Sequence, residues 1–595
     1  MVSLAVGAAF DFSEAVAKAA IASTIAFADT VLWVAIVFSM AAPMILSGLY
    51  EASVDRQILE TIHKDVDSPN STENGNNTSP TSNNAIETQK TAAASSKVKP
   101  MHEEKAQDEI VAEAYSNTKE SPNTPPQHKK PRSLTEFSKK TKHRLHLLYA
   151  ILIGNLELKE KLDLPADKLE QQETSDSTAD TVKSLNVWDD VKWLVNEHKD
   201  EIETTRMRLK SMLESQSSFG ASVGAPVVFF LGSFLFSVFG NLQSLGDNDT
   251  SHSVAFGEWW MTIPHVAIVS GCLLAGNNPN IFEGIICNLR SMPKPEKSQG
   301  LWETVWEIIA RRRKSTSPPQ QLWKDADNIF INIYGPFYES QYQPVWMWNR
   351  GQNKQKWINR VQRLYNENPK KMKHPTLTGK LPLLNWIAWS YLVFFAVFLI
   401  LGPFVLAYLT AYYTPTVGLS CRSFTFVLYF ICQGWLSITW GWKFHNTYRR
   451  MEGEADEKTD HVDVALFIST GIGFCGAMLT TIAGTFMQIV GVYRNCKCMI
   501  PMNAWGSSSS PVVLSTNTAQ QIDLAGRYWL KTSIASIVWL VVTCYVGWWY
   551  QRHWRSFFKT LVDHVLNAES LAQNDAEAHS FAKGHSNVEV KEVTE

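Results

Sequence analysis

Seven stretches of this chain are apolar over roughly the 20 residues that a helix needs to cross the hydrocarbon core of a bilayer. Inside lipid each backbone amide and carbonyl must be satisfied within its own segment, so such stretches can only be helices. The sequence therefore predicts an all-α membrane protein with about seven transmembrane helices. The predicted spans are residues 30–50, 219–242, 259–275, 383–408, 424–442, 464–493 and 532–550.

Two of these spans have competing interpretations. Residues 30–50 could belong to a cleaved signal peptide, but Lys18 is the only cation before Asp29, whereas a signal peptide begins with a basic cluster. Residues 259–275 form the weakest span, because Glu258 adjoins it and Pro264 interrupts it. Six transmembrane helices is therefore the alternative count.

Loop charge predicts the orientation, since short loops rich in Lys and Arg stay on the cytoplasmic side. The linkers 243–258 and 409–423 contain Arg422 as their only Lys or Arg, whereas the loop 276–382 is basic and the tail after Tyr550 begins with Arg552, Arg555 and Lys559. The predicted exterior parts are residues 1–29 and 494–531, and the predicted cytoplasmic parts are two large loops, 51–218 and 276–382, and the tail 551–595.

The first large loop combines a disordered stretch with helical ones. Residues 68–132 are rich in Asn, Ser, Thr, Pro and Lys and nearly lack aromatics, a composition that cannot bury enough apolar surface to fold. Residues 145–156 are apolar but too short to cross, and residues 187–213 have amphipathic spacing. We expect these two segments to be helices that pack on each other; a partner-binding helix is the alternative.

The second large loop, residues 276–382, has the aromatic content of a folded region. Within it, Trp302 and Trp306 share one helical face directly before a basic cluster, Arg311, Arg312, Arg313 and Lys314. Such a helix is suited to an anionic lipid surface. A helix that packs on the ends of the spans would have the same pattern, and the sequence favours neither. The bilayer is the expected partner, protein partners are unknown, and no nucleic acid is expected.

The predicted exterior contains three cysteines and one glycosylation acceptor. Cys421 lies near Cys496 and Cys498 in this topology, so a disulfide from Cys421 to one of that pair is predicted. Metal binding by the Cys-x-Cys pair is the alternative, although no His lies near it. Acceptor tripeptides for N-glycosylation begin at Asn248, on the exterior, and at Asn70, Asn76 and Asn77, in the cytoplasmic loop.

Polar groups inside spans are candidates for function because they are costly in lipid. His265 follows Pro264 in the third span, and it would be either a proton or substrate site or a histidine hydrogen-bonded to a neighbouring helix. Gln433 and Gln488 are expected to form hydrogen bonds across helices. These three residues make up the candidate intramembrane polar site.

The sixth span contains a Gly-x-Gly-x-x-Gly sequence at residues 471–476, the spacing of a dinucleotide-binding loop. That loop needs a preceding strand and a solvated helix N-terminus, whereas these glycines lie in a predicted membrane span. Gly473, Ala477, Thr481 and Gly484 instead form a stripe of small residues for close helix packing. No catalytic residue, cofactor site or metal site is predicted.

Three aromatic motifs resemble filamentous-fungal multi-pass membrane proteins without an assigned activity: residues 346–350 (WMWNR), 503–506 (NAWG) and 548–552 (WWYQR). The resemblance implies a fungal integral membrane protein of the plasma membrane or an endomembrane, with a role in development or secondary metabolism. The leading hypothesis is a non-enzymatic protein that acts in transport or as a membrane-anchored accessory factor. A seven-span receptor is the alternative, and an intramembrane enzyme the next.

Overall fold

The computed structural model describes residues 30–67, 137–158, 187–196, 202–243, 248–276, 278, 280–290, 342–365, 384–414, 417–451, 459–495, 497–500 and 518–589. These residues belong to one compact unit, and a second unit, Ser68–Leu134, lies outside them. The predicted disordered segment, the acceptors Asn70, Asn76 and Asn77, and the basic cluster at residues 311–314 also lie outside the described residues.

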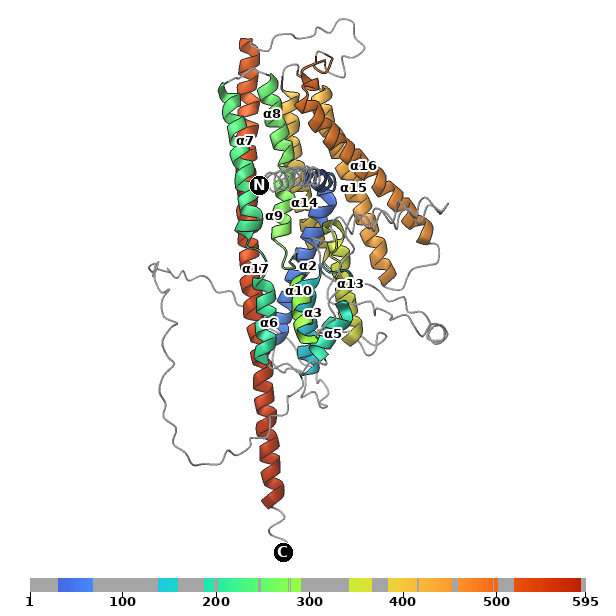
Figure 1. The fold of residues 1–595 in the computed structure, drawn as a ribbon, viewed down its shortest axis with the longest axis vertical. Coiled ribbons are helices and arrows are strands. Elements are labelled where there is room, and N and C mark those ends of the chain that lie inside the picture. Colours follow the sequence, from blue (N-terminus) through green and yellow to red (C-terminus); the bar gives the residue numbers. More distant parts are fainter. Residues whose placement is uncertain are drawn as a thin grey trace, which may run out of the picture. The chain divides into compact units, whose positions relative to one another are not determined.

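The described parts of the chain are helical, and their only strand-like pairing is a single bridge between Leu156 and Pro344. Figure 1 labels the helices in chain order. They are α2 (Ala41–Asp67), α3 (Lys139–Ile153), α5 (Val187–Asn196), α6 (Ile202–Glu214), α7 (Ala225–Gln243), α8 (Asn248–Trp260), α9 (Thr262–Gly271), α10 (Asn280–Arg290), α13 (Met347–Tyr365), α14 (Trp386–Tyr412), α15 (Cys421–Met451), α16 (Thr459–Ile489) and α17 (Ala519–Glu589).

Five described helices are long and apolar enough to cross a membrane, and they match five of the predicted spans. A sixth candidate is a broken span, the short helix Thr30–Ser39 followed by α2, with a bend of 72° between them. The five are Gly220–Gly240, Trp386–Tyr412, Cys421–Thr447, Val464–Ile489 and Ile522–Asp575.

The predicted count of seven is not confirmed, because the third predicted span is divided. Residues 259–275 are shared between α8 and α9, which are separated at Met261 and are each too short to cross alone. The pair still carries the chain from one end of the bundle to the other. His252 of α8 bonds Arg422 at the start of α15, whereas the Ala275 carbonyl, past α9, accepts a hydrogen bond from Arg350 of α13.

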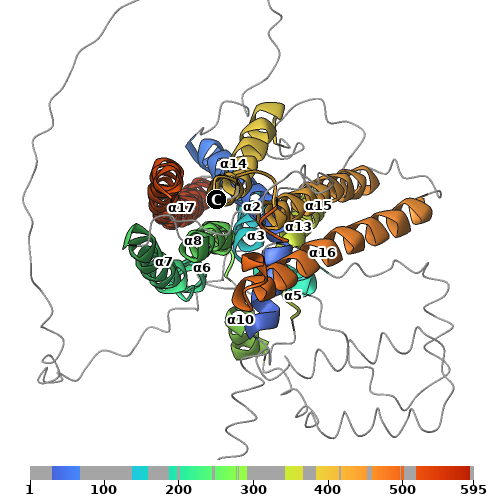
Figure 2. The same cartoon turned by 90° about the horizontal axis from the view of Figure 1, so that it is seen from above.

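Exposed apolar side chains cover the outer faces of the candidate spans. Phe229, Phe236 and Phe467 are 79–81% exposed, as expected of surfaces that face lipid. Viewed end-on in Figure 2, α2 lies among the other helices, and it contacts α9, α13, α14, α15 and α17. The helices predicted at 145–156 and 187–213 are present as α3 and as two helices, α5 and α6, and α3 packs on both.

Candidate functional site in the membrane bundle

The first candidate span is broken at Met40, and a proline accounts for the break. Pro43 lies in the first turn of α2 and has no N–H to donate to the Ser39 carbonyl four residues earlier. A carbonyl freed in this way is costly in a membrane unless another group bonds it. The break therefore needs polar partners from a neighbouring helix.

Two side chains of α15, one turn apart, supply these partners. The Gln433 amide donates to the Ser39 carbonyl at 2.9 Å and accepts from the Ala42 N–H at 3.0 Å. The Tyr429 hydroxyl donates to the Phe38 carbonyl at 2.8 Å. The backbone groups that lose their helical partners at the break are thus hydrogen-bonded by side chains of α15.

The α8–α9 break at Met261 has the same sequence pattern, but its polar side chains come from α9 itself. Pro264 stands three residues after Met261, as Pro43 stands three residues after Met40. The Thr262 hydroxyl donates to the Trp259 carbonyl at 2.9 Å, and His265 Nδ1 lies 2.7 Å from the Met261 carbonyl. Both breaks thus have a Met-x-x-Pro sequence, and polar side chains bond backbone carbonyls close to each of them.

The two breaks lie side by side in the structure. Phe38, directly before the first break, has its ring 4.7 Å from that of Trp259 and 5.9 Å from that of Trp260, directly before the second. Its other neighbour is Tyr429, at 4.9 Å. Phe38, Trp259 and Tyr429 are all buried, so the breaks meet in a closed aromatic core.

A fully buried carboxyl group, that of Glu258, lies next to this core. Its Oε2 accepts a hydrogen bond from the Thr410 hydroxyl of α14 at 2.7 Å, and its Oε1 has no partner of good geometry. The hydroxyls of Thr532 and Ser536 on α17 face the same group. Among the described residues, no basic side chain pairs with Glu258.

Polar side chains continue from this carboxyl along one face of α17. Thr543 lies two turns after Ser536, and its hydroxyl is 3.3 Å from Nε2 of the fully buried His265. Tyr550 follows after two more turns and donates to the Ala52 carbonyl of α2 at 3.1 Å. The face thus links Glu258 with the middle of α2.

A buried set of four charged residues lies near that end of the face. Arg350 of α13 binds both carboxylate oxygens of Glu51, at 2.8 and 3.0 Å. Lys354 lies 3.0 Å from Asp55 and donates to the Ala150 and Ile151 carbonyls of α3. The ion pairs join α2 to α13, and the hydrogen bonds of Lys354 join α13 to α3.

The residues singled out from the sequence are not all brought together. His265 and Gln433 belong to the two breaks, whereas Gln488 lies half-buried near the end of α16. Asn248 is the first residue of α8. Cys421 and Cys498 are free thiols that interact with each other, and Cys496 lies outside the described residues.

The stripe of small residues on α16 faces α15, which confirms its predicted packing role. Ala477 and Thr481 are buried, and a side-chain carbon built on Gly484 would lie 2.9 Å from the Thr425 methyl group. One built on Gly473 would lie 2.9 Å from the Trp435 ring. The two helices can therefore pack this closely only because these positions of α16 carry small side chains or none.

Glu258 was not among the predicted site residues, because in the sequence it is only a charge that adjoins the weakest span. The repeated Met-x-x-Pro sequence, at residues 40–43 and 261–264, was the available signal for both breaks. Comparison of the chain with protein-family models, curated proteins and solved structures finds no match.

Proposed function

We propose that this protein is a membrane carrier that takes up a proton or a small cation at Glu258. The observation that carries the proposal is a buried carboxyl, without a basic partner, beside the broken first span and the separation of α8 from α9. An ionised carboxylate in such surroundings is very costly unless it holds a proton or a cation. Carriers commonly build their substrate and ion sites where discontinuous helices meet.

The surroundings of Glu258 suit either ion. Three hydroxyls, from Thr410, Thr532 and Ser536, surround the carboxyl, and hydroxyl and carboxylate oxygens are ligands for hard cations. A proton on Oε1 would also satisfy this oxygen by turning it into a donor. His265, two turns further on, adds a second group that can exchange a proton. We propose that α8 and α9 form one broken span that carries both residues.

Ion flux into vesicles tests the proposal. The full chain is reconstituted, and H⁺, Na⁺ and K⁺ movements are followed under an imposed membrane potential. Glu258→Gln, which keeps the size and one acceptor oxygen of the side chain, should lower the flux at least tenfold. Glu203→Gln, an exposed change with 61% of the native side chain accessible, should leave it unchanged.

Carbodiimide labelling gives a readout that does not depend on transport. Hydrophobic carbodiimides modify protonated carboxyls in apolar surroundings, so wild-type protein should be labelled at Glu258, and the bound cation should protect it. If Glu258 is not labelled and Glu258→Gln carries ions as the wild type does, the proposal is wrong. The chain would then act as an accessory factor or a receptor.

A further inference from the structure

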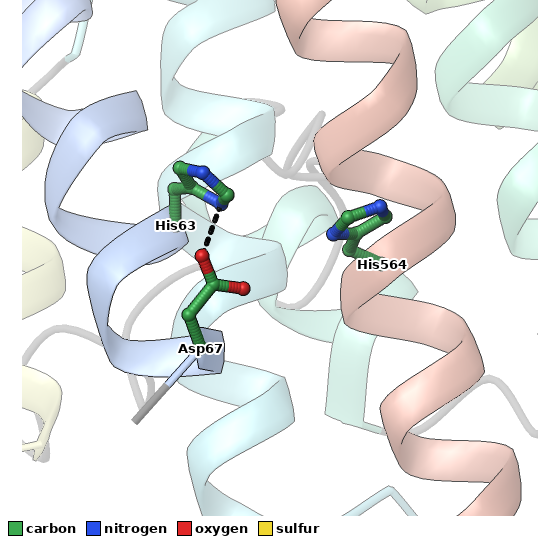
Figure 3. A group of neighbouring side chains, drawn as sticks. All are labelled: His63, Asp67 and His564. Atoms are coloured by element: carbon green, nitrogen blue, oxygen red, sulfur yellow. Dashed lines mark ion pairs between the residues drawn. The ribbon is translucent and has the colours of Figure 1, made fainter. Parts of the chain in front are cut away.

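A cluster of metal-ligand side chains, outside the Glu258 site, lies between α2 and α17. His63 and Asp67 are one turn apart on α2, and His564 extends toward them from α17 (Figure 3). One ligand atom from each of the three residues can be chosen so that all lie within 4.8 Å of one another. Three protein ligands, with one position left open, is the ligand number of many zinc sites.

We propose that His63, Asp67 and His564 bind a divalent transition metal, with Zn²⁺ the best fit. Two imidazole nitrogens and one carboxylate oxygen form a donor set that Zn²⁺ prefers, with a fourth position left for water. Zinc bonds of about 2.0 to 2.1 Å in a tetrahedron place the ligand atoms about 3.3 Å apart. His63 Nδ1 and Asp67 Oδ2 are already 3.3 Å apart.

The third ligand needs only a small movement. Closing a separation of 4.8 Å to about 3.3 Å takes a shift of roughly 1.5 Å, which rotation of an exposed side chain can supply. His564 is exposed, so its ring has room to turn toward the pair on α2. A bound ion would therefore draw the His564 ring onto the pair on α2.

The backbones beneath the ligands are held in place. Ile62 of α2 and Val565 of α17, each next to a ligand, are fully buried in the core. The His63 ring packs edge-on against Phe557 of α17 at 5.4 Å. Ligands carried by packed helices keep their spacing, which is the condition for a pre-organised metal site.

The neighbouring acids are already paired, which leaves Asp67 for the metal. Asp65 binds Arg144, and Asp563 binds Lys210 and Arg206. Among the described residues, the partner of Asp67 is His63, which is itself a ligand. The ion would thus join the end of α2 to α17 at the point where the chain continues into residues 68–136.

Cobalt absorption tests the site directly. Full-length protein in detergent is freed of metal with a chelator and titrated with Co²⁺, whose visible band is intense in a tetrahedral site. Wild-type protein should show this band, and Zn²⁺ should remove it. His63→Ala and His564→Ala should each weaken Co²⁺ binding at least tenfold. His553→Ala changes an exposed histidine of α17, the helix that also carries His564, and should bind Co²⁺ as the wild type does.

Thermal unfolding tests whether the metal joins the two helices. Zn²⁺ should raise the unfolding temperature of the wild type and of His553→Ala but not of His63→Ala or His564→Ala, each compared with its own metal-free form. Absence of a tetrahedral Co²⁺ band in the wild type would overturn the proposal. So would a band that survives in either His63→Ala or His564→Ala.

Discussion

At the scale of single residues, Lys354 is a buried charge with partners on two other helices. It is fully buried, yet its amine reaches two carbonyls of α3 and the carboxylate of Asp55. Gly154 makes this possible, because a side-chain carbon there would overlap the Lys354 amine. Buried ion pairs add little stability over apolar packing, but breaking one leaves an uncompensated charge.

Replacing Lys354 with Met should therefore be strongly destabilising. The change leaves Asp55 without its basic partner, and the loss of one member of a buried pair costs about 3 to 5 kcal/mol. Lys356→Met, on the same helix but half-exposed, should cost less than about 1 kcal/mol. Unfolding of both variants in detergent checks this, and equal stability would mean that the four charges do not act as a unit.

Two histidines of α3 should make the fold sensitive to acid. Burial lowers the pKa of His143 and of His146 from 6.5 to about 4. Above pH 6.5 both rings are neutral in the folded and unfolded states, so they contribute no pH dependence there. As the pH falls from 6.5 toward 4, the two histidines bind protons in the unfolded chain but stay neutral in the folded chain. The free energy of unfolding therefore decreases over this range.

The loss amounts to at most about 3 kcal/mol for each histidine at the acid end of that window. Unfolding is measured in detergent at several pH values, in the wild type and in His146→Gln. The variant should lose less stability on acidification, whereas His553→Gln, an exposed change, should follow the wild type. Parallel curves for all three proteins would rule out burial of a neutral His146.

At the scale of helices, close packing of α16 on α15 depends on the absence of side chains. The glycines and small residues of the stripe let two backbones approach, where lipid gives no hydrophobic drive to associate. The side of α16 that faces α15 has no room for a side chain at its glycines, whereas the opposite side is open. A side-chain carbon at Gly484 would meet Thr425, whereas one at Gly471 would meet nothing within 4 Å.

Replacing Gly484 with Leu should therefore destabilise the protein, and Gly471→Leu should not. Overpacking a close contact costs roughly 1 to 3 kcal/mol. The same substitution at Gly471 adds a side chain on an open face of the same helix and should be nearly neutral. Comparison of the two melting curves in detergent decides this, and coincident curves would show that α16 does not need close contact with α15.

Helices were easier to predict from this sequence than their breaks. Long apolar runs such as residues 386–412 are recognisable because lipid tolerates only satisfied backbone. The third predicted span is divided at Met261 into two short helices. Hydropathy is averaged over a window of residues, so it does not reveal such a break. Glu258 looked like a defect in an apolar run because its partners, Thr410 and Thr532, come from segments far away in the sequence.

At the scale of the whole molecule, the contacts at the helix ends show which linkers lie together. The start of α8, the end of α14 and the start of α15 meet where Arg422 bonds His252 and lies next to Thr414. Tyr413 also stacks on Tyr528 of α17 at 3.6 Å. The linkers poor in Lys and Arg therefore share one end of the bundle with the start of α17.

This grouping leads us to expect that residues 494–531 are exterior and that the tail after α17 is cytoplasmic. A protease added to intact cells should spare a tag at the C-terminus and should digest it after permeabilisation. A tag inserted between residues 506 and 510 should show the opposite behaviour. Digestion of the C-terminal tag on intact cells would reverse the orientation.

Helix α17 has 71 residues without an interruption. At 1.5 Å per residue it measures about 105 Å, more than three times the roughly 30 Å of a hydrocarbon core. The helix that faces Glu258 also carries His564, and Ser536 and His564 lie about 42 Å apart along it. A tilt of about 5° at its membrane part would displace a point about 75 Å further along by about 6 Å.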